Sequence, residues 1–155
     1  MFETGQSATD FTLPDGGGTA HTLSDYRGGW VLVSFYPADD TPGCTKQACS
    51  VRDNEAALGA AGITVLSISP DDQASHQRFT EKYALTHTLL CDPEKVVMEA
   101  WGAWGEKMLY GKTVIGTKRI AYLIDPEGVV RKVWKRVRTA EHAEDILKAH
   151  AALVA

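Results

Sequence analysis

The chain has 155 residues, a length that fits one domain of residues 1–155 whose core needs neither disulfides nor a structural metal. Its formal net charge of −4 argues against a general nucleic-acid binder. There is no run of about 18 apolar residues and no secretory-signal pattern, so we expect a cytoplasmic protein without membrane contact. Three cysteines without an export signal fit a reducing compartment, where thiols serve catalysis or redox chemistry.

The predicted elements alternate between strands and helices. In chain order they are a hairpin (11–13 and 20–23), a strand (30–36), a helix (44–58), a strand (63–69), a helix (73–83), a short strand (88–91), a short helix after Pro93, a Gly-rich connection (102–118), two strands (119–124 and 129–134) and a last helix that Thr139 caps. The strands at 30–36 and 63–69 are nearly continuously apolar, which indicates burial on both faces. This order predicts an α/β fold with a central mixed sheet, helices on both faces and an N-terminal β-hairpin. The connection at 102–118 is long enough to predict a functional loop over a site.

The segment that joins the first buried strand to the first helix carries the chemistry. Cys44 lies at the start of that helix, where unpaired backbone N–H groups and the helix dipole favour the thiolate, the reactive form of cysteine. The dipole alone contributes only about 0.3–1 kcal/mol, so more positive charge is needed. Arg119, at the start of a predicted strand, is the candidate, because its guanidinium stays charged and holds a thiolate and an oxygen together.

Other residues of this segment support the same chemistry. Thr41 offers a hydroxyl three residues before Cys44, able to exchange hydrogen bonds with a substrate oxygen. Pro37 and Pro42 stiffen the turn. Cys49, five residues after Cys44, is a possible partner for an oxidised sulfur.

These residues resemble a known active-site motif, the Pro-x-x-x-Thr-x-x-Cys of the peroxiredoxins, at Pro37, Thr41 and Cys44. The stretch from Thr41 to Cys49 is similar to the Q-type subgroup, also called bacterioferritin comigratory proteins. The similarity continues in order along most of the chain, through residues 35–37, 69–71, 79–83, 89–92, 104–107, 110–112 and 119–125. The resemblance implies a thioredoxin-like fold and a thiol-specific peroxidase that reduces hydrogen peroxide and organic hydroperoxides to water and alcohols without a cofactor.

The resemblance also implies a role for each site residue. Cys44 is then the peroxidatic nucleophile, which becomes a sulfenic acid, while Thr41 and Arg119 position and polarise the peroxide. Pro37 and Gly43 belong to the substrate-binding turn, in which backbone N–H groups at Gly43 and Cys44 help hold the O–O unit. Cys49 is the resolving cysteine, whose disulfide with Cys44 is recycled by thioredoxin or a similar dithiol reductant. The resemblance further suggests a monomer.

Helix geometry adds a condition to the role of Cys49. Positions five apart on an intact helix place their Cα atoms about 8–9 Å from each other on different faces. A disulfide spans at most about 7 Å between Cα atoms. If Cys44 and Cys49 share one helix, forming their disulfide requires the first turn to unwind.

Several residues also have a purely structural interpretation. Cys49 is then a packing residue. Cys91 stands where the family resemblance leads us to expect serine, and it is then a buried thiol at a strand end. This interpretation of Cys91 is favoured over a second resolving or regulatory thiol. Trp101 and Trp104 wall the pocket or fill the core. The basic run 131–138 is a solvated strand or a docking patch for an acidic partner. The histidines lack zinc-site spacing, so no metal site is expected.

Two other functions remain open from the sequence. A redox sensor on the same fold would use the Cys44–Cys49 pair as a switch, but it would not need Thr41 and Arg119 beside the thiol. A thioredoxin-like disulfide oxidoreductase is disfavoured because the two cysteines have four residues between them, where that class has two.

Overall fold

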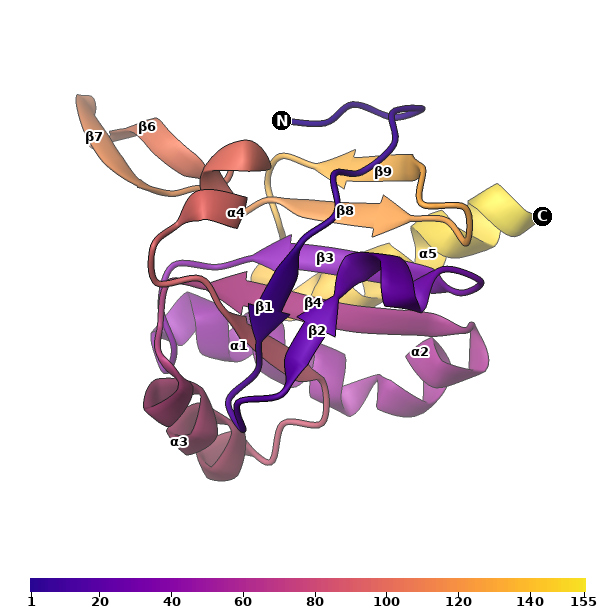
Figure 1. The fold of residues 1–155 in the computed structure, drawn as a ribbon, viewed down its shortest axis with the longest axis horizontal. Helices are drawn as coiled ribbons and strands as arrows, with labels where there is room; N and C mark the ends of the chain where they lie inside the picture. Colours follow the sequence, from indigo (N-terminus) through magenta and orange to yellow (C-terminus); the bar gives the residue numbers. More distant parts are fainter.

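The computed structural model describes all residues 1–155, which fold around one five-stranded sheet. The strand order is β5-β4-β3-β8-β9, formed by β5 (Thr88–Cys91), β4 (Ile63–Ser69), β3 (Trp30–Phe35), β8 (Ala121–Ile124) and β9 (Val130–Trp134). The pairs β3–β4 and β4–β5 are parallel, whereas β3–β8 and β8–β9 are antiparallel. This is the mixed sheet that the sequence predicts (Figure 1).

Both faces of the sheet are covered. The front face in Figure 1 carries the N-terminal hairpin of β1 (Thr12–Pro14) and β2 (Ala20–Thr22), the 3-10 helix η1 (Leu23–Tyr26) and α4 (Val96–Ala100). The opposite face carries α1 (Pro42–Asp53), α2 (Glu55–Ala60) and α5 (His142–Val154), while α3 (Gln73–Tyr83) packs beside β5. None of these helices has the length and apolar character that a membrane span requires.

Strand β3 shows why its sequence is continuously apolar. Val31, Val33 and Phe35 belong to the hydrophobic cluster on the hairpin side of the sheet. Leu32 belongs to the cluster on the side of α1, α2 and α5. Alternate side chains point to opposite faces of a strand, so a strand covered on both faces is apolar at every position.

The first helix differs from its predicted bounds. It begins at Pro42, where proline is favoured because the missing N–H lies among groups that have no helical partner. It ends at Asp53, and α2 starts two residues later. Asn54 makes the break, because its Nδ2 donates to the Ser50 carbonyl at 2.8 Å and its backbone leaves the helical region. The predicted single helix at 44–58 is therefore two helices.

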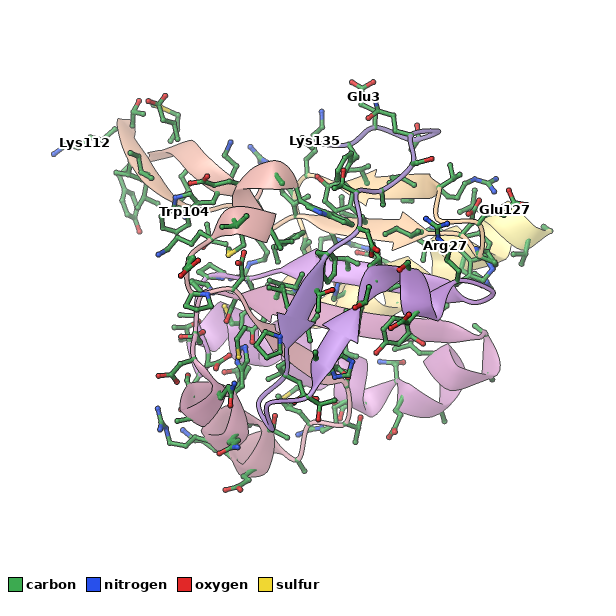
Figure 2. All side chains as sticks on the ribbon, viewed as in Figure 1. Glu3, Arg27, Trp104, Lys112, Glu127 and Lys135 are labelled. Atoms are coloured by element: carbon green, nitrogen blue, oxygen red, sulfur yellow. The ribbon has the colours of Figure 1, made fainter.

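Two further expectations were wrong in detail. Thr139 does not cap the last helix but starts the 3-10 helix η2 (Thr139–Glu141), which leads into α5. The predicted irregular connection at 102–118 is a hairpin of β6 (Trp104–Leu109) and β7 (Lys112–Thr117). Its two-residue turn has φ of 51° at Tyr110 and 78° at Gly111, the turn type that matches strand twist. The hairpin extends from the body of the molecule, with Trp104 at its base and Lys112 at its tip (Figure 2).

Two histidines with a buried, unpaired ring nitrogen constrain stability. His142 opens α5 at 2 % exposure, and its Nε2 has no hydrogen-bond partner, as is also true of His87 Nδ1 just before β5. Burial lowers the pKa of each to about 4, and for His142 the neighbouring His87 lowers the pKa further. An unfolded histidine titrates near the ordinary value of about 6.5. Below that pH the unfolded chain therefore takes up protons that the folded chain excludes.

We predict that acid weakens the fold through these histidines. Their contribution is complete above pH of about 6.5 and is lost as the pH falls towards 4, with a slope of up to about 1.4 kcal/mol per pH unit for each proton. His142→Leu should flatten the decline of the unfolding free energy over this range, as measured by urea unfolding at a series of pH values. An equally steep decline in the variant would contradict the prediction.

Candidate active site

The Cys44 sulfur lies against the guanidinium of Arg119. Both terminal nitrogens, Nη1 and Nη2, are 3.4 Å from the sulfur, and Cys44 is only 2 % exposed. Nη1 also donates a hydrogen bond of 2.7 Å to Gln47 Oε1. Cys44 and Gln47 are three residues apart in α1, so a single face of the helix meets the guanidinium. Gln47 is buried and orients the arginine that contacts the sulfur.

The sheet topology explains how residues 75 positions apart meet. Helix α1 follows the end of β3, and Arg119 lies directly before the start of β8. Because β3 and β8 are antiparallel, the end of one lies beside the start of the other, as Figure 1 shows. Phe35 N donates to the Ile120 carbonyl at 2.9 Å at this edge. The register of two core strands therefore positions the arginine.

Gly43 provides the space for this arrangement. A Cβ atom at this position would lie 3.2 Å from Arg119 Nη2 and 3.8 Å from its Cζ. The guanidinium therefore packs over the backbone of the first helical turn, where any side chain would displace it. The turn predicted to bind substrate is therefore also the surface on which the Arg119 guanidinium packs.

Thr41 occupies the N-cap position of α1 in an extended conformation, and its carbonyl accepts a hydrogen bond of 2.8 Å from Thr45 N. Its hydroxyl donates to the Ala38 carbonyl at 2.9 Å. The proton of this hydroxyl is thus used within the loop, and its oxygen remains free to accept a hydrogen bond from a substrate. Pro37 starts the loop and makes no hydrogen bond to Cys44 or Arg119.

The middle of the loop is held by α3. Asp40 has a φ of 58°, the left-handed region that side chains rarely adopt. Lys82 Nζ donates to Asp40 Oδ2 at 2.7 Å and Tyr83 OH donates to Oδ1 at 2.8 Å. The hydrogen bonds from Lys82 and Tyr83 lower the pKa of Asp40, so the carboxylate is charged at neutral pH. These contacts hold the loop in a strained conformation just before Thr41.

The other two cysteines differ in their surroundings. Cys49 is half-buried in α1, one and a half turns after Cys44, and all three cysteines are free thiols. Cys91 is 2 % exposed at the end of β5. Burial, with the charges of nearby aspartates, raises the pKa of Cys91 to about 11. At neutral pH Cys91 is therefore protonated and a poor nucleophile.

The charge beside Cys44 comes from Arg119. His87 lines the same small cavity as Cys44, about 10 Å³ in volume, together with Tyr36 and Phe79. With a pKa of about 4, His87 is neutral at pH 7, as is the nearby His142.

The two tryptophans considered as walls of the pocket, Trp101 and Trp104, do not line the cavity beside Cys44. Trp101 is 1 % exposed in the core, where its ring contacts Phe2, Phe11, Phe35 and Tyr122.

One cluster in the protein has the composition of a metal site. Ligand-type atoms of Asp39, Asp71 and His76 lie within 4.8 Å of one another. They bond to neighbouring protein groups: Asp39 Oδ2 to His76 Nδ1, and Asp71 Oδ2 to the backbone N of Asp39. The cluster is a hydrogen-bond network within the fold, and the absence of a metal site stays a prediction.

Comparison with known proteins gives the site a family. The model of the AhpC/TSA family matches residues 4–133. Peroxiredoxin Bcp of Escherichia coli strain K12 is 46 % identical over 143 residues, which are 92 % of each chain. Peroxiredoxin Bcp of Bacillus subtilis is 38 % identical over 146 residues, 94 % of this chain and 93 % of that one.

Solved structures that resemble this chain belong to the same group of proteins. The bacterioferritin comigratory protein of Xanthomonas campestris, studied for alkyl peroxide reduction, has a TM-score of 0.87 and 34 % identity over 94 % of this chain and 92 % of that chain. A cysteine variant of Xylella fastidiosa PrxQ has a TM-score of 0.92 and 30 % identity, over 100 % of this chain and 99 % of that chain. These structures confirm the predicted thioredoxin-like fold. The chain therefore belongs to the AhpC/TSA family as a peroxiredoxin of the Bcp and PrxQ group, the thiol-dependent peroxidases.

Proposed function

We propose that Cys44 is the peroxidatic cysteine of this enzyme. Its thiolate attacks one peroxide oxygen, the O–O bond breaks, and the leaving oxygen takes a proton to depart as water or an alcohol, while Cys44 becomes a sulfenic acid. Negative charge develops on the leaving oxygen, so preorganised donors directed at it lower the barrier. The contact of Arg119 with the sulfur is the observation that carries the proposal, because it holds a permanent cation at the point of attack.

The surrounding residues complete the proposed site. Thr41 accepts a hydrogen bond from the peroxide, since its own proton is directed to Ala38. Gln47 holds Arg119 in place. Pro37 follows β3 in the loop and keeps the loop stiff, and Gly43 lets the guanidinium approach the first turn.

The proposed second step joins Cys44 to Cys49. The Cys49 sulfur attacks the sulfenic sulfur, the S–O bond breaks, and water leaves with formation of the disulfide. Both residues lie in α1, so their Cα atoms are about 8–9 Å apart, beyond the reach of about 7 Å. The first turn of α1 must unwind for this step. A dithiol reductant then restores both thiols by exchange.

The substrate is a hydroperoxide, and a thiol compound supplies the electrons. We propose that organic hydroperoxides are substrates beside hydrogen peroxide, supported by the alkyl peroxide reduction described for the Xanthomonas protein. We propose a thioredoxin-type protein as the reductant and a monomer as the working form. The cytoplasmic location stays a prediction.

Turnover with a thioredoxin system tests the assignment. Wild type should consume many equivalents of hydrogen peroxide and of an alkyl hydroperoxide, and Cys44→Ser should consume none. Cys49→Ser should oxidise once and stop, because its sulfenic acid has no partner thiol. Cys91→Ser should behave as wild type, since Cys91 is buried and protonated. A wild type that oxidises once without turnover would instead support the sensor function.

A glycine pair tests the geometry at Arg119. Gly43→Ala should slow Cys44 oxidation about tenfold, because even small displacements of a positioned group are costly in rate and the new methyl group would press on Nη2. Gly59→Ala is the matched control, since a Cβ at this position in α2 meets no atom within 4 Å. It should keep the rate of wild type and stabilise the fold by about 0.5–1 kcal/mol. Equal rates in both variants would show that the approach of Arg119 is not limiting.

Hydrogen exchange tests the unwinding of α1. In the reduced protein, amides of residues 44–50 should exchange slowly, because they lie within the helix. After oxidation with one equivalent of peroxide, the same amides should exchange much faster. Equally slow exchange in both forms would exclude the Cys44–Cys49 disulfide as proposed.

A further inference from the structure

A buried ion pair lies under the loop that leads to the active site. His76 of α3 and Asp39 of the loop approach to 2.7 Å, and their side chains are 1 % and 4 % exposed. The same carboxylate accepts hydrogen bonds from Tyr36 OH at 2.6 Å and Ser75 Oγ at 2.8 Å. None of these four residues has a role in the chemistry described above.

The hydrogen bonds determine the protonation of the ring. Nδ1 of His76 faces Asp39 Oδ2, and Nε2 faces the Leu90 carbonyl at 2.9 Å. A carbonyl oxygen only accepts hydrogen bonds, and the Asp39 oxygen already accepts from Ser75. Both ring nitrogens therefore need a proton, which makes His76 an imidazolium paired with a carboxylate.

This pair fastens the loop to the core. Asp39 is held through its side chain by α3 and through its backbone N–H, which donates to Asp71 Oδ2 at 2.8 Å. The Leu90 carbonyl belongs to β5, so His76 links the loop to the sheet. The next residues are Asp40, also held by α3, and Thr41, whose hydroxyl bonds back to Ala38. A displacement of Asp39 would therefore move Thr41 and the start of α1.

We propose that His76 is a positioning residue for the peroxide site: its imidazolium, bonded to Asp39 and the Leu90 carbonyl, holds the loop that carries Thr41 and leads to Cys44 in its reactive geometry. The proposal rests on the proposed function of Cys44. It adds a second anchor of the site besides Arg119, and it makes the order of this loop depend on one proton.

The surroundings of His76 favour that proton. The titratable groups around the ring are Asp39 from the loop, Asp71 and Asp72 at the start of α3, Tyr36 directly after β3, Cys91 from β5 and Asp15 from the N-terminal hairpin. Burial lowers the pKa of His76, but the hydrogen bond and charge of Asp39, with the Leu90 carbonyl, outweigh burial and leave the pKa raised. The pair is therefore complete below the pKa of free histidine, about 6.5, and is lost as the pH rises through the higher folded value.

The matched experiment compares two histidines that each pair with an aspartate. His21 bonds to Asp15 at the same distance of 2.7 Å, in the N-terminal hairpin and outside the site. His76→Gln should lower the rate constant of Cys44 oxidation by peroxide about 10- to 100-fold, as expected for a site displaced by up to about 1 Å. His21→Gln should keep the rate of wild type. The rates are measured by competition with a second peroxidase, so that only the first oxidation is observed.

Two further readouts separate positioning from a loss of stability. In wild type the oxidation rate should fall at alkaline pH as His76 loses its proton, and this decline should be absent in His76→Gln. Amides of residues 38–44 should exchange faster in the reduced variant, while those of β4 stay protected. Asp39→Asn keeps the shape of the side chain and removes its charge, and it replaces His76→Gln if that variant fails to fold. It should likewise lose the alkaline decline in rate and show faster exchange of residues 38–44.

The outcomes are distinguishable from those of the proposed function. A wild type without peroxide turnover would overturn the assignment of Cys44, whatever the His76 variant does. An active wild type with unchanged rate, pH profile and exchange in both His76→Gln and Asp39→Asn would overturn the positioning role alone. A rate loss of equal size in His21→Gln would also contradict it.

Discussion

The Arg119 guanidinium contacts the Cys44 sulfur through both terminal nitrogens at 3.4 Å, and the rest of the site is arranged around this contact. A hydrogen bond to a charged group contributes about 1.5–3 kcal/mol, compared with about 0.3–1 kcal/mol for a helix dipole. The nearby His87 and His142 are neutral at pH 7. The arginine is therefore the main source of positive charge at the sulfur, and its position is fixed by strand register and by Gln47.

The sequence predicts those parts of the fold that follow from a pattern within one segment. The strands β3 and β4 were predicted because continuous apolar runs mark them, and α3 has the predicted bounds of 73–83. The β6–β7 hairpin was missed because Gly105 and Gly116 interrupt the alternation and much of its surface is exposed. The family resemblance implies that Thr41, Cys44 and Arg119 act together, and the structure places the Arg119 guanidinium against the Cys44 sulfur.

Other residues of the site depend on contacts between distant segments. Gln47 shares a helix face with Cys44, which is a local signal, but its arginine partner is 72 residues away. His76 and Asp39 are 37 residues apart, and no pattern in either segment indicates that they meet. A histidine in an otherwise polar helix is normally interpreted as a surface residue. Only packing of α3 against the loop and β5 makes it a buried cation.

The packing of α1 fits the proposed unwinding of its first turn. The first turn of α1 buries Cys44 and no large apolar side chain, whereas Ala48 and Val51 anchor the helix further along. Unwinding this turn thus costs a few backbone hydrogen bonds, about 0.5–1.5 kcal/mol each, and not the 1.5–3 kcal/mol of a large buried side chain. In the proposed cycle the sulfenic acid is neutral, so oxidation also removes the charge that held the sulfur to Arg119. The reaction with peroxide itself weakens the contact that kept the first turn folded, while the ion pair of Asp39 and His76 keeps the preceding loop attached to the core.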